Sequence, residues 1–305
     1  MSIVVVNPPL GAALGGGGGP ANFGDLALVP HGTAPTLPSA GNVGLIARRY
    51  AGWTLPVLVD SNGYESIIGP DRLWGADFRI GFASGPTIFH DNLPGLQTAS
   101  TAFSIVAPGV GSLPGDLLPR MQHVGAGVGA GAGWSTNTGI GNPSSGNPFI
   151  RRTGFLIELM FRMAGTHALG QTCAAGLSQA WTTGTPASFL NLWQVGFEPA
   201  DALADGLYFT RRGAGAAVRE ALGAAFPRNA TTVFRLFLGA RADDTSRMFL
   251  TLINVNTGAV IEREATTDIP GLDTALNLQC AHNQQSSGVN ANMQTYYAHG
   301  FFELP

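Results

Sequence analysis

Apolar residues recur along the chain in short runs bounded by turn residues, and no helical period is sustained over three turns. Phe78, Ile80 and Phe82 alternate with Arg79 and Gly81. This two-residue alternation predicts a strand with one buried face, because successive side chains of a strand point to opposite sides. The pattern indicates an all-β protein.

The strongest strand signals lie in the C-terminal half. Residues 155–163 (FLIELMFRM) are apolar enough to predict a strand that is covered in part on both faces. At 216–225 a short helix competes with a loop or a single turn. Further strands are expected at 189–197, 207–210 and 293–302, a strand–turn–strand at 255–261, and a pair of neighbouring strands at 232–239 and 248–255. Short strands separated by turns predict a jelly-roll-like β-sandwich.

Glycine and proline dominate the N-terminal stretch. Five consecutive glycines at 15–19 precede Pro20, and Pro30, Pro35 and Pro38 follow. Glycine raises backbone entropy and proline removes a hydrogen-bond donor, so we expect an extended arm and no regular element through about residue 40. Such an arm could anchor the chain on a neighbouring subunit; a leader without a function is the alternative.

A second low-complexity stretch covers residues 107–148. Long loops without structure are uncommon inside a compact domain, so we place a boundary near residue 148. The predicted organisation is an extended anchoring arm over 1–55, a small β module with a glycine-rich connector over 56–148, and a sandwich over 149–305.

Charge is scarce in this chain. Charged residues make up 11% of it, the formal net charge is −3, and every basic residue apart from histidine is an arginine. Phosphate binding needs a basic patch, so nucleic acid is not an expected partner. A weakly charged surface suits a large assembly, since few charges must be desolvated at its contacts.

The two cysteines, Cys173 and Cys280, are far apart in sequence and lack the spacing of metal ligands. Buried free thiols are the favoured interpretation, and a disulfide is the alternative. The N-terminus has neither a basic segment nor a long apolar segment, and no apolar run is long enough to span a membrane. We therefore expect no secretory signal and no membrane insertion.

Two groups of sequence blocks resemble a known family. Residues 192–197 (LWQVGF) followed by 207–209 (LYF), and 254–258 (NVNTG) followed by 266–270 (TTDIP), resemble the C-terminal lectin-like β-sandwich of tail-fibre and related structural proteins of tailed bacteriophages. Upstream, 59–64 (VDSNGY) is similar to the short module that often precedes that domain.

The resemblance covers residues 56–305 and departs from the family in the leader and the glycine-rich stretch. It implies a virion protein, assembled in the host cytoplasm, that forms a homotrimer. The N-terminal arm would bind other virion proteins. The point of attachment to the particle, whether tail fibre, tail tip or capsid, stays open.

Sequence motifs that would indicate a catalytic site are weak or missing in this chain. There is no G-x-S-x-G nucleophile elbow, no phosphate loop followed by lysine, and the six histidines are scattered. We therefore expect no catalytic residue, no cofactor and no metal. Glycan hydrolysis would need two facing carboxyl groups, and solvated charge is the simpler interpretation of the candidates Glu158, Glu198, Asp201, Asp205, Asp243, Asp244, Glu262, Glu264 and Asp268.

Binding of a carbohydrate needs only aromatic faces and polar groups for hydroxyls. Polar loops of the C-terminal half offer these groups, and the alternative is that their amides face a neighbouring subunit or water. The candidate glycan-binding residues are Trp181, His282, Asn283, Gln284, Gln285, Asn290 and Asn292.

The sequence thus predicts a bacteriophage virion structural protein of tail-fibre or spike type that attaches to a host-surface glycan and is not an enzyme. The first alternative is a capsid-attached decoration protein or tail-tip scaffold with no receptor role. The second alternative is a polysaccharide depolymerase.

Overall fold

The computed structural model describes most of the chain from residue 38 onward. The described ranges are 38–62, 65–67, 77–82, 88–91, 96–98, 103–106, 120–125, 131–136, 149–164, 170–179, 190–283 and 291–302. Helical structure within these ranges consists of two single 3₁₀ turns, Arg151–Thr153 and Leu203–Asp205. No helix in the described part is long and apolar enough to cross a membrane.

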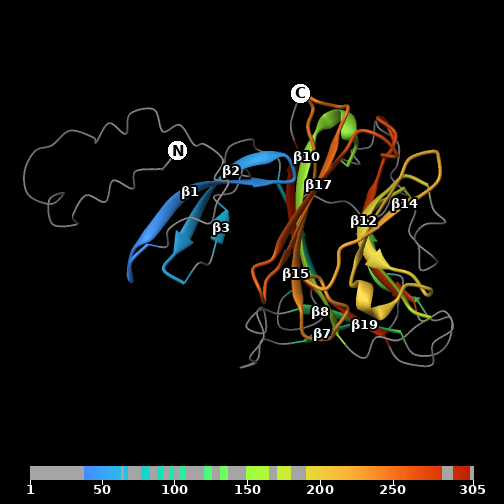
Figure 1. The fold of residues 1–305 in the computed structure, drawn as a ribbon, viewed down its shortest axis with the longest axis horizontal. Helices are drawn as coiled ribbons and strands as arrows, with labels where there is room; N and C mark the ends of the chain where they lie inside the picture. Colours follow the sequence, from blue (N-terminus) through green and yellow to red (C-terminus); the bar gives the residue numbers. More distant parts are fainter. Residues whose placement is uncertain are drawn as a thin grey trace, which may run out of the picture.

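Two antiparallel sheets pack face to face and form the sandwich (Figure 1). The larger sheet has the order β17-β16-β15-β10-β19-β4-β5, and β8 joins it by pairing with both β19 and β7. Its strands are β4 (Asp77–Phe82), β5 (Ile88–Asp91), β7 (Phe103–Val106), β8 (Arg120–Gly125), β10 (Phe155–Ala164), β15 (Val233–Ala240), β16 (Met248–Asn254), β17 (Val260–Ala265) and β19 (Ala291–Phe302).

The second sheet has seven strands in the order β14-β13-β12-β11-β18-β9-β6. The strands are β6 (Leu96–Thr98), β9 (Gly131–Thr136), β11 (Thr172–Ser178), β12 (Leu192–Phe197), β13 (Tyr208–Arg212), β14 (Val218–Ala221) and β18 (Asn277–Asn283). The all-β sandwich predicted from the sequence is therefore confirmed.

Several individual predictions can be compared with these strands. The expected pair at 232–239 and 248–255 is confirmed, because β15 and β16 are hydrogen-bonded neighbours. In the segment 216–225 the competing helix is a correction: residues 218–221 form strand β14, which pairs with β13, and the residues on either side are loop and turn. Pairing with the edge of the sheet outweighs the helical preference of its alanines.

The core lies between the two sheets. In β10, Phe155, Ile157, Leu159 and Phe161 face this core, and they meet residues such as Trp193 of the seven-stranded sheet. The intervening residues of β10 face the opposite side of the sheet, as alternation requires. The prediction of a strand covered on both faces is confirmed, since both sets are buried.

A hairpin formed by β1 (Val43–Tyr50) and β2 (Trp53–Asp60) covers part of the outer face of the larger sheet. Together with β3 (Glu65–Ile67) it makes a third, three-stranded sheet beside the sandwich (Figure 1). Ala51 and Gly52 form its turn with positive φ angles of 45° and 84°, the geometry that suits a tight two-residue hairpin.

Strands from both sides of residue 148 share the two large sheets, because β4 pairs with β19 and β9 pairs with β18. Residues 43–55, which the sequence assigns to the arm, include β1 and the start of β2. The division at residues 55 and 148 stays a prediction, and the arm over 1–37 lies outside the described residues.

Candidate functional site

Three chain segments meet at one end of the seven-stranded sheet. Ser178, the last residue of β11, pairs with Leu192 at the start of β12 and with Asn277 at the start of β18. The residues that follow or precede these positions, among them Gln179 and Asn191, therefore lie close together although they are distant in sequence.

Three carboxamides fix this end of the sheet; we call Gln179, Asn191 and Asn277 the amide cluster. Asn191 Nδ2 donates to Gln179 Oε1 at 2.6 Å, and Asn277 Nδ2 donates to the Gln179 carbonyl at 3.2 Å. The Gly271 backbone N–H donates to Asn191 Oδ1 at 3.0 Å. Asn191 has a φ of 55°, a conformation that asparagine tolerates better than most residues.

The amide cluster is reachable from solvent on one side. Gln179 is exposed, and the neighbouring Leu190 is 46% exposed. Asn277 lies beneath them and is 1% exposed, and its Oδ1 has no hydrogen-bond partner. A buried acceptor without a donor costs about 1–3 kcal/mol. This oxygen is closed to solvent, so a hydroxyl or an N–H group would reach it only after the exposed Gln179 side chain moved aside.

A second unpartnered acceptor lies on the same face of β18. Gln279 is fully buried, and its Oε1 has no partner, while its Nε2 donates to Gln194 Oε1 at 3.2 Å. The two glutamines meet across Gly176, which pairs with both of them and has no side chain to separate them. Asn277 and Gln279 are two residues apart, so their side chains are about 7 Å apart along the strand.

The candidate residues predicted from the sequence fall in two places. His282 and Asn283 end β18, where Asn283 pairs with Thr172, whereas Asn277 pairs with Ser178 at the other end of β11. His282 is 3% and Asn283 is 8% exposed. Asn292 belongs to β19, in the other sheet, and its side chain lies outside the described residues, as do Trp181, Gln284, Gln285 and Asn290.

The three residues of the amide cluster are not among the binding residues predicted from the sequence. Trp181 follows Gln179 by two residues, so the predicted loop starts at this end of the sheet. The loop after Asn283 starts at the opposite end. Long-range strand pairing decides this separation, and residue types alone carry no sign of it.

Carboxylates that were candidates for catalysis are held by arginines. Arg219 donates to Asp201 through two bonds of 2.7 and 2.6 Å, and Glu198 lies 3.5 Å from the same guanidinium. The Tyr208 hydroxyl donates to Asp205 at 2.5 Å, and this bond raises the pKa of Tyr208 to about 12. The arrangement orders the β12–β13 connection.

Glu158 lies on the outer face of the larger sheet and is 4% exposed. It accepts bonds from Arg235 Nε at 2.7 Å and the Tyr297 hydroxyl at 2.5 Å, and His299 Nε2 lies 3.1 Å away. Burial alone would raise its pKa, but Arg235 and His299 hold the pKa of this carboxyl well below its usual range. Glu158 is therefore an ionised acceptor, not a proton donor.

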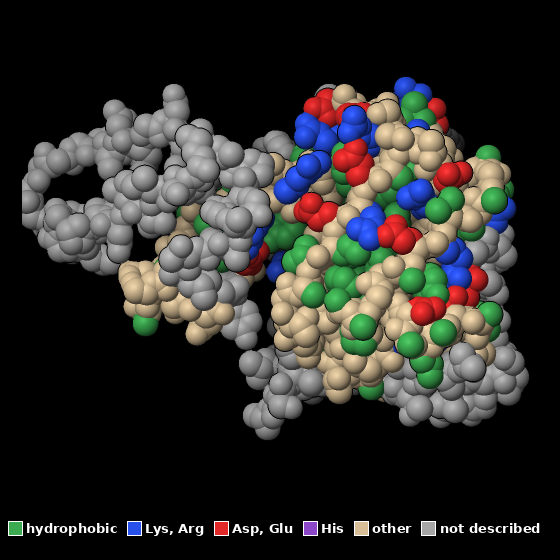
Figure 2. Space-filling model, viewed as in Figure 1, with side chains coloured by type: hydrophobic (Ala, Val, Ile, Leu, Met, Phe, Trp, Pro, Cys, Tyr) green, Lys and Arg blue, Asp and Glu red, His purple; other side chains and the backbone are tan. Residues whose placement is uncertain are grey.

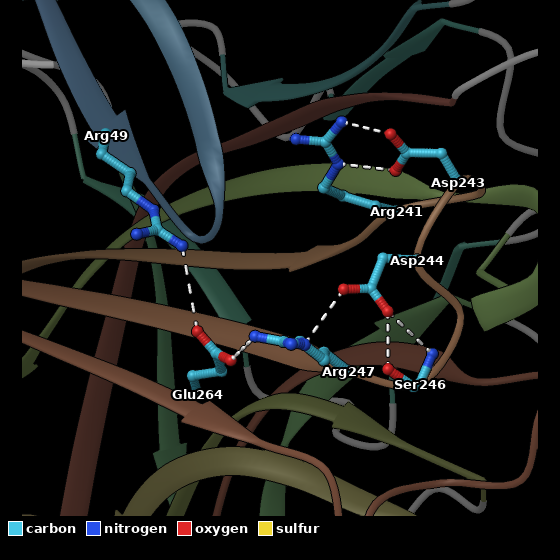
Figure 3. Close-up of polar contacts among 7 residues, drawn as sticks. All are labelled: Arg49, Arg241, Asp243, Asp244, Ser246, Arg247 and Glu264. Atoms are coloured by element: carbon cyan, nitrogen blue, oxygen red, sulfur yellow. Dashed lines mark hydrogen bonds and ion pairs between the residues drawn. The ribbon is translucent and has the colours of Figure 1, made fainter.

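A further ionic network surrounds the docked hairpin (Figure 3). Arg247 bridges Asp244 at 3.0 Å and Glu264 at 2.5 Å, and Arg49 of β1 lies 3.8 Å from the same Glu264. Arginine and acidic side chains lie next to each other on the face drawn in Figure 2, without a patch of one sign. In the described part of the chain, no group of three or more His, Cys, Asp or Glu side chains could hold a metal.

No family model matches the chain, and no curated protein matches it either. A solved structure of a protein of unknown function from Shewanella oneidensis MR-1 aligns with a TM-score of 0.51 at 11% identity, over 75% of this chain and 87% of that one. Arcelin-5, a lectin-like defence protein from Phaseolus vulgaris, aligns at 0.44 and 10% identity over 75% and 98% of the two chains.

A seed lectin of Lotus tetragonolobus aligns with a TM-score of 0.42 at 10% identity, over 75% of this chain and 99% of that one. Identities this low show the fold alone. The strand topology, and not these alignments, shows that the chain is an all-β sandwich; lectin-like domains are among the structures with which it aligns. None of these neighbours links it to a bacteriophage particle.

Proposed function

We propose that this chain is a virion structural protein, of tail-fibre or spike type, whose sandwich attaches the particle to a glycan on the host surface. The amide cluster is the proposed attachment site. The observation that carries the proposal is the unpartnered Oδ1 of Asn277, buried beneath the exposed Gln179. A sugar hydroxyl would supply the missing donor once the Gln179 side chain moved aside.

The composition of the site favours a neutral glycan. Carboxamides donate and accept in fixed directions, and they recognise hydroxyl groups without the desolvation cost of a charge. Leu190 adds apolar surface next to them, which suits the C–H face of a sugar ring. Single sites of this kind bind weakly, so a homotrimer would raise the affinity through avidity.

The virion assignment rests on the sequence blocks at 192–197 and 254–258 that resemble phage tail proteins and on the low content of charge. It can be tested separately from sugar binding. Antibodies against the purified chain should label the distal tail structures of intact particles in electron micrographs. Labelling of the capsid alone would favour the decoration role instead.

Sugar binding is tested with the purified full chain on a glycan array and on host cells. Asn277→Ala and Gln179→Ala should each reduce retention, while Thr54→Ala, at an exposed position of β2 far from the cluster, should bind like the wild type. If the wild-type chain binds cells and the two amide variants bind equally well, the attachment site lies elsewhere. Light scattering should give the mass of a trimer.

A further inference from the structure

Three sulfur atoms meet in the centre of the sandwich. Met293 of β19 comes from the larger sheet, and Cys173 and Cys280 come from neighbouring strands of the seven-stranded sheet. Met293 Sδ is 3.6 Å from Cys173 Sγ and 3.4 Å from Cys280 Sγ. All three residues are at most 2% exposed.

The positions of the two cysteines do not favour a disulfide. Cys173 pairs with His282, and Cys280 pairs with Ala175, so the cysteines are diagonal neighbours. Diagonal neighbours in a sheet are about 7–8 Å apart between Cα atoms, whereas disulfides usually need about 4.4–6.8 Å. Both thiols are free, as the sequence analysis favoured.

Burial raises the pKa of both thiols, to about 12 for Cys173. Arg228 opposes this rise at Cys173, and a hydrogen bond with Thr295 opposes it at Cys280. Both thiols are therefore protonated at neutral pH in the metal-free chain.

Arg228 is unusual in its own right. It is 7% exposed, its guanidinium lies 3.8 Å from the centre of the Phe197 ring, and its Nη1 donates to the Asp201 carbonyl at 3.0 Å. Its Nε and Nη2 are buried without a hydrogen-bond partner. Phe197 pairs with Cys173 across β12 and β11, so this buried cation lies near the Cys173 side chain and would help to balance negative charge there, in addition to its interaction with Asp201.

We propose that Cys173, Cys280 and Met293 form a buried site for one Cu(I) ion. Thiolate and thioether ligands are the soft donors that select Cu(I). Binding would form two Cu–S(thiolate) bonds and one dative bond from Met293 Sδ, release both thiol protons to solvent, and change no oxidation state. Two thiolates and one Cu(I) carry a net charge of −1, which the cation of Arg228 neutralises.

Zinc fits this site less well. Structural zinc requires four ligands, drawn from cysteine, histidine and carboxylates. No third residue of these types joins the two cysteines among the described residues. The three-sulfur set with its thioether therefore points to a monovalent ion.

The test uses the reduced full chain without oxygen, titrated with Cu(I) against a chelating competitor. The chain should retain one equivalent and show only sulfur neighbours in X-ray absorption. Cys173→Ser and Cys280→Ser should abolish retention, and Arg228→Met, which removes only the neighbouring charge, should weaken binding roughly 10–100-fold. Met248→Leu, a fully buried change in the same core, is the control and should bind normally.

A measurement on the wild type avoids variants that fail to fold. Ligands that bind only the folded state raise the melting temperature, so one equivalent of Cu(I) should raise the Tm. The proposal is overturned if the wild type leaves all copper with the competitor, or if it shows no rise in Tm. It is equally overturned if the two serine variants hold copper as tightly as the wild type.

Discussion

Replacement of Gly239 by alanine should loosen the N-terminal hairpin from the sandwich. A Cβ at this position would lie 2.4 Å from the Ala51 carbonyl oxygen and 3.2 Å from Trp53 Nε1. Contacts below 3.0 Å require movement, and a backbone carbonyl is the atom that must move. The hairpin turn therefore stays in place under strain or lifts from β15.

The two responses, a strained turn and a lifted turn, have similar costs in free energy. Overpacking costs about 1–3 kcal/mol. Lifting the turn would break the bond from the Ala51 N–H to Thr251 Oγ1, 2.8 Å long, at about 0.5–1.5 kcal/mol. It would also separate the stacked rings of Tyr50 and Phe237, 4.4 Å apart, at about 0.5–1.5 kcal/mol. The free energy of unfolding should fall by about 1–3 kcal/mol by either route.

Urea denaturation measures the loss in free energy of unfolding. Hydrogen exchange at the Ala51 amide distinguishes a strained turn from a lifted one, because lifting would expose this amide to solvent. Gly44→Ala is the matched control on the same hairpin: its Cβ would meet atoms no closer than 3.9 Å. Its stability should be unchanged or raised by up to about 1 kcal/mol. Equal stability of the Gly239→Ala and Gly44→Ala chains would refute the docking geometry.

Three other perturbations separate buried from exposed electrostatics. Glu158→Gln leaves Arg235 without its charged partner and should lower stability by about 3 kcal/mol in urea denaturation. Because folding depresses the pKa of Glu158, its contribution to the free energy of unfolding is complete above its unfolded pKa of about 4.3 and is lost as the pH falls from there through the folded pKa. The variant lacks this carboxylate, so it should lose less stability than the wild type as the pH is lowered below about 4.3. Parallel plots of stability against pH for the two chains would count against an ionised Glu158. Arg247→Ala breaks only exposed pairs and should cost less than about 1 kcal/mol, with the difference shrinking in high salt. In ultraviolet titration, one tyrosine should ionise near pH 12, and Tyr208→Phe should remove that step; its persistence would assign it to another tyrosine.

Local patterning predicted only part of the core. The apolar runs at β10, β15 and β16 were predicted as strands, and their residues line the core between the sheets. Strands β11 and β18 also line this core but were not predicted, and β8 and β9 lie in the stretch 107–148 that was predicted to be a glycine-rich connector. Where local preference and pairing disagree, the sequence was misleading. The alanines before and after Val218 favour a helix, yet β14 pairs with β13, and Glu220 joins Arg263 of β17 across the two sheet edges.

The turn of the β1–β2 hairpin shows a different limit of prediction from the sequence. Ala51 occupies a φ of 45°, which alanine rarely adopts, and it lacks the Asn-Gly signal that marks such turns. Contacts with Gly239 and Thr251, about 190–200 residues further along the chain, stabilise this conformation. No window of the sequence around residue 51 contains that information.

Both proposed sites arise from strand neighbours that the sequence does not indicate. In the amide cluster, Asn277 and Gln179 are 98 residues apart. Beside the cluster, Gln194 and Gln279 are 85 residues apart and meet because β11 lies between their strands and has a glycine at their level. A Cβ on Gly176 would lie 2.6 Å from the Trp193 carbonyl oxygen, so the glycine is required by close packing as well as by the contact between the glutamines. Cys173 and Met293 are 120 residues apart, and their contact requires the two sheets to face each other in this order. Rules based on the sequence spacing of metal ligands assume that the ligands lie in one loop or turn. They cannot detect a site whose ligands come from two different sheets.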